Sequence, residues 1–258
     1  MPEVGLAAPA LAPFTTAQIA VAASAWPMRA AEELRSALVF RALGAATRAA
    51  QLGPRWVERF ETVAREEVAH ARLCAAVGAR LGAGAPRYDA SPLRPRFAAY
   101  PDPALRALSL LLIEVAMGET VSVGLLRAAR RDTCEPFARS VLGSILRDEA
   151  GHQRLGWDAL ADLRASLPPT MLELMQAEAT LGLGGLERQI ALPAMRWLEA
   201  GRSFDPAHAA LGVLAPEARV AAFYEAIESL VLRRLTELGL DGALAWRDRH
   251  RPARSRAQ

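Results

Sequence analysis

Apolar residues recur along this chain at intervals of three and four positions, which is the spacing that one face of an amphipathic α-helix requires. The stretches with this pattern are rich in Ala, Leu, Glu and Arg, all of which favour helices. Runs of β-branched or aromatic residues, and the short turns that join strands into hairpins, are nearly absent. The pattern therefore predicts an all-α fold.

Prolines and glycines divide this pattern into helices, because neither residue favours a helix interior. The breaks expected from them are Pro27, Gly53–Pro54, 82–103, 132–136, Pro168–Pro169, Gly182–Gly185, Pro193, 201–206 and Pro216. Four long helices remain, at 28–51, 55–81, 103–131 and 136–165. The expected organisation is an N-terminal arm over 1–27, a four-helix bundle over 28–165, a helical extension over 166–246 that packs on the bundle, and a disordered basic tail over 247–258.

The lengths of the connections indicate how the four helices are joined. The turns near residues 53 and 133 are short, whereas the link over 82–102 is long. Short turns produce antiparallel hairpins, and a long link can cross from one end of a bundle to the other. The sequence therefore predicts two antiparallel hairpins joined by one long crossover.

Two of the four histidines lie three residues after a glutamate, in Glu67-Val-Ala-His70 and Glu149-Ala-Gly-His152. On an α-helix these positions are about 60° apart, so a carboxylate and an imidazole lie side by side on one face. The remaining residues of both faces are apolar, which places the pairs in the predicted core. Buried carboxylates without a partner cost several kcal/mol unless a cation offsets their charge, so either pair could hold a metal ion.

The other two predicted helices each supply a glutamate on an otherwise apolar face. Glu33 precedes Glu67 by 34 residues, and Glu119 precedes Glu149 by 30 residues. About half of each interval runs up one helix and half returns along the next, so each hairpin brings its two glutamates to nearly the same height. The ligand set expected at the middle of the bundle, which is that of di-iron and di-manganese carboxylate sites, is Glu33, Glu67, His70, Glu119, Glu149 and His152.

Three further acidic residues lie close to this set. Glu114 is five residues before Glu119 and is expected about 140° away round the helix, so it is either an alternative ligand or a residue that supports a ligand or links helices. Glu66 and Asp148 each precede a ligand glutamate. We expect each of these two to accept a hydrogen bond from the histidine of the other hairpin and so to fix its tautomer.

The ligand chemistry favours particular ions. Carboxylates that can bridge, with one imidazole for each ion, suit iron or manganese better than zinc, which prefers closed tetrahedral sites. We expect two iron ions, with mixed Mn/Fe or two manganese ions as alternatives. Small residues near Glu33 and Glu119 either leave room for a bound molecule or allow close helix packing; they are Ser36, Ala37, Ala116, Gly118 and Ser122.

A lone Glu followed by Glu-x-x-His, occurring twice, resembles the ferritin-like di-iron carboxylate superfamily, which includes rubrerythrins and ribonucleotide reductase small subunits. The resemblance covers about residues 28–165 and implies a ferritin-like four-helix bundle. More locally, four segments are similar to a bacterial group of uncharacterised ferritin-like domain proteins, namely Glu33-Leu-Arg-Ser36, Glu66-Glu67-Val-Ala-His70-Ala-Arg72, Gly118-Glu119-Thr120 and Asp148-Glu149-Ala-Gly-His152.

This chain departs from some members of the superfamily. It has only two cysteines, so the four-cysteine iron module of rubrerythrins is missing. Ile145 stands where arylamine N-oxygenases have a further histidine ligand. The three tyrosines lie outside the four motif segments, which does not favour a radical-storing role.

The resemblance implies a non-haem di-iron oxidoreductase that activates O₂, as co-substrate, to oxidise or oxygenate a small organic molecule held in an apolar cavity. It also implies an electron-donor protein or another reductant as partner. The alternative is a rubrerythrin-like peroxidase, or an iron-handling or storage protein, with no organic substrate. The C-terminal helices, including 217–240, are expected to wall the cavity or to form the face of a homodimer.

Charge and hydropathy indicate neither a nucleic-acid nor a membrane partner. The formal net charge is +3, and its one concentrated patch is the arginine-rich tail, a pattern typical of a solvated chain end, so we expect no binding to nucleic acid. The longest apolar run, 107–117, contains Ser109 and Glu114 and is too short to span a bilayer. Because the N-terminal residues also lack a positively charged leader, we expect a cytoplasmic protein without a membrane segment.

Overall fold

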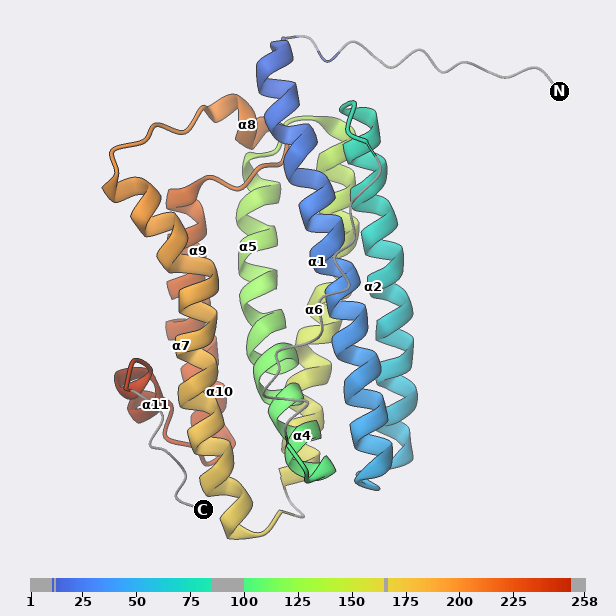
Figure 1. Ribbon diagram of the computed structural model, residues 1–258, viewed down its shortest axis with the longest axis vertical. Helices are drawn as coiled ribbons and strands as arrows, with labels where there is room; N and C mark the ends of the chain where they lie inside the picture. The colour runs from blue at the N-terminus through green and yellow to red at the C-terminus, as the bar shows by residue number, and fades with distance from the viewer. Residues whose placement is uncertain (1–10, 12, 85–99, 165–166, 252–258) are drawn as a thin grey trace, which may run out of the picture.

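The computed structural model describes residues 11, 13–84, 100–164 and 167–251. Long, nearly parallel and antiparallel helices make up the molecule (Figure 1), and no strand occurs among the residues that are described. The all-α prediction is confirmed. The four long helices of the bundle lie where the apolar periodicity placed them, but the first begins well before its predicted start.

The first hairpin consists of α1 (Thr16–Ala49) and α2 (Pro54–Arg80), which pack along their whole length. Gly53 adopts φ 82° in the turn, a left-handed conformation that glycine takes without strain, and Pro54 then begins α2. The predicted start of the first helix at residue 28, and with it the arm over 1–27, is wrong. A capping box between Thr15 and Gln18 starts α1 twelve residues earlier, and the helix continues through Pro27.

The second hairpin is formed by one continuous rod and an antiparallel partner. The rod comprises α4 (Pro103–Leu110), the π-helical segment η1 (Leu111–Met117) and α5 (Gly118–Asp132), and its partner is α6 (Pro136–Arg164). The π-helical turn in the middle of the rod was not predicted. The end of α2 and the start of α4 lie at opposite ends of the bundle (Figure 1), as two hairpins joined by a crossover require. The crossover itself, over 85–99, lies outside the described residues.

The C-terminal part adds helices against one side of the rod (Figure 1). They are α7 (Pro169–Glu199), α8 (Pro206–Ala210), α9 (Pro216–Ala226), the π-helical η2 (Ile227–Val231), α10 (Leu232–Glu237) and α11 (Gly242–Asp248). The breaks predicted at Gly182–Gly185 and Pro193 do not occur, because α7 runs through both. A Cβ atom on Gly182 would lie 2.6 Å from Met117, so this glycine allows α7 to approach η1 closely instead of ending the helix.

The predicted disordered tail over 247–258 is wrong for its first residues. Arg249 donates hydrogen bonds of 2.8 and 3.1 Å to the buried carboxylate of Glu187, and its guanidinium lies 3.7 Å from the ring centroid of Trp246. This ion pair and cation–π contact hold the end of α11 against α7. Residues 252–258 lie outside the described part of the chain.

The rod Pro103–Asp132 is long and apolar enough to cross a membrane by length and composition. However, 72% of its apolar window is buried inside the protein, where it contacts α1, α6, α7 and α9. Its apolar character is therefore that of the central helix of a bundle.

Candidate metal centre

Six side chains from four helices converge at the middle of the bundle. Glu33 comes from α1, Glu67 and His70 from α2, Glu119 from α5, and Glu149 and His152 from α6, and all six are buried. Their ligand-type atoms form two groups, each within 4.8 Å: the first is Glu33, Glu67, His70 and Glu149, and the second is Glu119, Glu149 and His152. The structure thus brings together all six residues that the sequence singled out, and this cluster could hold metal ions.

The two histidines point the same ring nitrogen at the cluster. His70 Nδ1 lies 3.6 Å from Glu67 and 3.4 Å from Glu149. His152 Nδ1 lies 2.8 Å from the other oxygen of Glu67 and 3.4 Å from the other oxygen of Glu149. Glu67 and Glu149 therefore each turn one carboxylate oxygen towards each histidine. Glu33 completes the His70 side, with an oxygen 3.8 Å from Nδ1.

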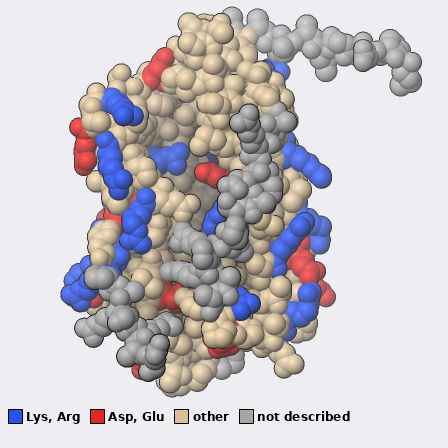
Figure 2. Space-filling model, in the orientation of Figure 1, with Lys and Arg blue, Asp and Glu red and all other residues tan. Residues whose placement is uncertain are grey.

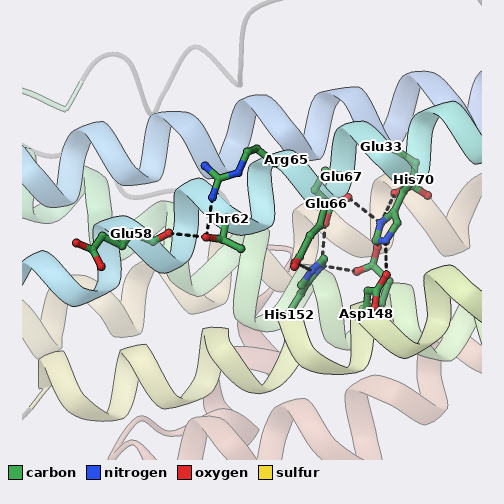
Figure 3. A network of polar contacts seen from close by, with 10 residues as sticks. Glu33, Glu58, Thr62, Arg65, Glu66, Glu67, His70, Asp148 and His152 are labelled. Atoms are coloured by element: carbon green, nitrogen blue, oxygen red, sulfur yellow. Dashed lines mark hydrogen bonds and ion pairs between the residues drawn. The ribbon is translucent and has the colours of Figure 1, made fainter.

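The outward nitrogens of both histidines are held by carboxylates from the opposite hairpin (Figure 3). His70 Nε2 lies 3.1 Å from Asp148, and His152 Nε2 lies 2.9 Å from Glu66. The predicted hydrogen bonds across the two hairpins are therefore present. Because a carboxylate only accepts, each Nε2 carries the proton, and in the neutral ring the lone pair then lies on Nδ1, which faces the cluster.

Burial and mutual repulsion act on the carboxyl groups. Burial raises the pKa of Glu33 well above its usual range, and the neighbouring charges of Glu149 and Glu67 raise it further. Burial likewise raises the pKa of Glu119, again with a contribution from Glu149. Burial also opposes ionisation of Glu149, but hydrogen bonds from His152 and His70 outweigh it and hold this pKa well below normal.

The neighbouring carboxylates favour the protonated form of the two histidines and raise their pKa values. Burial alone would lower the pKa of His70, but hydrogen bonding to Glu149 and Glu67 raises it to about 11. For His152 burial also acts downward, and the same two carboxylates raise its pKa to about 10. Without a metal ion the imidazoles are therefore protonated at neutral pH and act as the cations of the cluster.

Several buried atoms of the cluster have no hydrogen-bond partner beyond these contacts with one another, which tests whether metal ions fit. The unpartnered atoms are both oxygens of Glu67, Oε2 of Glu149, and Nδ1 of His70 and of His152. Buried polar atoms are almost always satisfied, and these five face one another. Four carboxylates and two imidazoles form a mainly oxygen donor set that suits Fe(II) or Mn(II), so the residues fit a metal centre.

Glu114 lies outside both groups of ligand-type atoms. Its carboxylate is 3.3 Å from the guanidinium of Arg35, so it links η1 to α1, which is one of its two predicted roles. The angle of 140° expected between Glu114 and Glu119 is wrong, because the i→i+5 hydrogen bonds of η1 widen the turn by one residue. Both side chains consequently line one cavity.

That cavity has a volume of about 210 Å³ and opens directly on Glu33, Glu119 and Glu149. Ser36, Gly118 and Ser122 are in its wall. The small residues near Glu33 and Glu119 therefore leave space, which is one of the two alternatives predicted from the sequence. Figure 2 shows a hollow near the middle of this face, with basic and acidic side chains inside it. The α7 and α9 helices close one side, so the C-terminal extension contributes to the wall.

The expectation of an apolar cavity is wrong. Three arginines line it, namely Arg29 and Arg35 from α1 and Arg219 from α9. The two on α1 lie within one turn of Glu33, so their positions carried a sequence signal that was not used. Arg219 had no such signal, because its position at the cavity depends on how α9 packs on α5.

Comparison with known proteins does not extend this description. The resemblance to ferritin-like di-iron proteins rests on the Glu and Glu-x-x-His spacings and on the fold expected from them. A scan against protein-family models and a search of curated proteins each gave no match to this chain.

Proposed function

We propose that this chain is a non-haem di-iron oxidoreductase of the ferritin-like kind, which uses O₂ to oxidise or oxygenate a small organic molecule. The observation that carries the proposal is the pairing of two symmetric half-sites with an adjoining cavity. Each half-site presents one inward Nδ1, and two glutamates turn an oxygen to both. The cavity reaches three of the four carboxylates.

On this proposal the six residues divide between two ions. Glu33 and His70 would hold one, Glu119 and His152 would hold the other, and Glu67 and Glu149 would be shared. Four carboxylates balance the charge of two divalent cations, which removes the cost of burying them. Such a pair of ferrous ions supplies electrons and open coordination positions for the reduction of O₂.

The protein's own residues prepare the site. Asp148 and Glu66 fix the orientation and tautomer of the histidines from outside the cluster. The ring of Phe40, whose centroid lies 5.9 Å from that of His152, is fully buried and helps to keep bulk water from the cluster. Insertion of one oxygen atom of O₂ into an organic substrate leaves the other as water and consumes two electrons and two protons. An external reductant must supply the electrons.

The test begins with the metal-free full chain, loaded with Fe(II) without oxygen. We expect about two iron atoms per chain by elemental analysis, followed by O₂ uptake on exposure to air. Glu67→Gln should lose this binding, because the variant removes the carboxylate that both half-sites share. Glu58→Gln serves as the control, since Glu58 is exposed on the same helix.

The outcomes separate the candidate functions. Failure to bind either iron or manganese in a folded chain would refute the proposal. Iron binding with rapid consumption of hydrogen peroxide but no O₂-dependent oxidation of any organic compound would instead favour the peroxidase or iron-handling alternative. The cavity beside Glu33, Glu119 and Glu149 favours an organic substrate over that alternative.

A further inference from the structure

Three arginines line the cavity beside the candidate metal centre, and none of them belongs to the cluster of glutamates and histidines. Arg35 is paired with Glu114 at 3.3 Å. Arg29 lies over the ring of Trp26, with its guanidinium carbon 5.3 Å from the ring centroid. Arg219 lines the same cavity from α9, and its guanidinium makes no hydrogen bond or ion pair with any residue in the described part of the chain.

The guanidinium of Arg219 is largely removed from water, although no carboxylate pairs with it in the described part of the chain. Burial lowers the pKa of its guanidinium; the nearby charge of Glu32 partly opposes this shift, and that of Arg29 adds to it. Glu32 is itself exposed, so water screens its attraction. A guanidinium in this position has five hydrogen-bond donors, arranged in a fork that matches an oxyanion.

Charge balance points to a single negative charge on the occupant. On the proposed function, two divalent ions cancel the four buried glutamates of the cluster, and Arg35 cancels Glu114. The rest of the cavity wall then has two guanidinium groups and one exposed carboxylate. One positive charge remains unbalanced in this cavity. The neighbouring cavity adds one carboxylate, that of Asp205, which already accepts hydrogen bonds from the backbone N–H of Ala207 and from Gln18.

A larger and more apolar cavity adjoins this one. A second cavity of about 600 Å³ shares Gln189, Ile190, Leu214 and Arg219 with the first. Its wall includes Trp197 and Phe204, whereas Leu125, Leu126 and Leu186 line the cavity next to the metal centre. Arg219 therefore lies at the junction of two spaces that both offer apolar surface.

We propose that these two adjoining cavities bind an amphiphilic organic monoanion, a carboxylate with an apolar chain, with Arg219, which lies in the wall of both, as the residue that holds the carboxylate. Bidentate hydrogen bonds from the guanidinium satisfy the charge, and the chain packs against the leucine and isoleucine side chains. The inference deepens the proposed function in one respect, because it names the chemical class of the substrate. The residues proposed to bind the carboxylate and its chain are not among the six candidate metal ligands.

Octanoate is a suitable probe, with octan-1-ol and octylamine as analogues that share its chain but not its charge. Isothermal titration of the full chain, both metal-free and loaded with Fe(II) without oxygen, should show octanoate binding at least about tenfold more tightly than either analogue. Arg219→Gln should weaken octanoate binding by about tenfold or more while leaving octan-1-ol binding unchanged. Arg219→Lys should retain part of the octanoate affinity.

Arg127→Gln is the matched control, since Arg127 is an exposed arginine that lines a different cavity between α5, α6 and α9. Its octanoate affinity should equal that of the unmodified chain. Equal binding of octanoate and octan-1-ol, or an octanoate affinity unaffected by Arg219→Gln in a variant with a native circular dichroism spectrum, would overturn the inference. Octanoate binding that depends on Arg219 in a chain that takes up no iron would uphold the inference and refute the proposed function.

Discussion

Removing Asp148 should weaken metal binding without unfolding the protein. Its carboxylate is the acceptor for Nε2 of His70, 3.1 Å away, and it leaves Nδ1 of that ring facing Glu67 and Glu149. Without this acceptor, the neutral imidazole can carry its proton on Nδ1, which is the nitrogen that a metal ion needs. Asp148→Ala therefore removes both the tautomer preference and the orientation of the ring.

The size of the effect follows from the position of Asp148. Loss of a carboxylate that supports a metal-bound histidine weakens metal affinity by about 10- to 100-fold, equivalent to about 1.4–2.7 kcal/mol. The Asp148 side chain is 50% exposed, so its replacement should change the free energy of unfolding of the metal-free chain by no more than about 0.5 kcal/mol. Glu66→Ala should behave alike, because the Glu66 side chain is 45% exposed and supports His152.

The assay is competition for Mn(II) or Fe(II) against a chromophoric chelator, without oxygen, paired with urea unfolding of the metal-free chain. Asp158→Ala is the matched control, since Asp158 is exposed on the same helix. Asp148→Asn should fall between Asp148→Ala and the unmodified chain, because the amide oxygen can still accept the hydrogen bond but carries no charge. Metal affinity in Asp148→Ala equal to that in Asp158→Ala would refute the role assigned to this carboxylate.

Three further predictions concern protons, packing and ligand loss. Metal affinity should rise from about pH 6 to pH 9, because the ions must displace protons held by His70 and His152, whose pKa values are about 11 and about 10. Titration calorimetry in buffers of different ionisation enthalpy should count at least about two protons released at pH 7, and any proton held by Glu33 or Glu119, whose pKa values are raised, adds to this number. A pH-independent affinity would contradict this. Gly156→Ala should lower the free energy of unfolding, measured with urea, by about 1–3 kcal/mol, because the new Cβ would lie 2.9 Å from the Cα of Ala116. Gly151→Ala is the control: a Cβ there has no such neighbour within 4 Å, so the variant should raise the free energy of unfolding by about 0.5–1 kcal/mol. Mn(II) at about one hundred times its Kd should stabilise the unmodified chain by about 2.7 kcal/mol per site, and Glu67→Gln should lose this gain while its metal-free form remains at least as stable.

Most of the cluster could be predicted because its signals are local. The spacing of three residues within an apolar helix face identifies two pairs, Glu67 with His70 and Glu149 with His152. Helix geometry then places both members of each pair on the face that points into the core. The partner glutamates follow from hairpin register, since the turn between two antiparallel helices determines which residues meet. The residues that hold the histidines from outside, Glu66 and Asp148, followed from the same register.

The errors occurred where packing overrides a local preference. Pro27 and the Gly182–Gly185 segment are unfavourable in an isolated helix, yet α1 and α7 continue through them. In α1 the cap at Thr15 begins the helix well before the proline, and in α7 the glycines face close neighbours. The capping box of Thr15 and Gln18 was a local sequence signal that was not used. The close neighbours of the α7 glycines, in contrast, come from distant parts of the chain and cannot be read from the sequence near the break. Arg219 was missed for the same reason, because more than 180 residues separate it from Glu33 along the chain.

The π-helical segment η1 connects the cluster to its cavity. In an α-helix Glu114 and Glu119 would face different directions, whereas the wider turn of η1 brings both to the cavity, where Glu114 neutralises Arg35. The backbone of η1 also packs directly against Gly156, one turn beyond His152, so its shape is coupled to the position of that histidine. A change that restored an α-helical turn at 111–117 would therefore shift the cavity charge and the metal ligands together. This coupling explains why an irregular turn lies in the most buried helix of the bundle, beside the candidate metal centre.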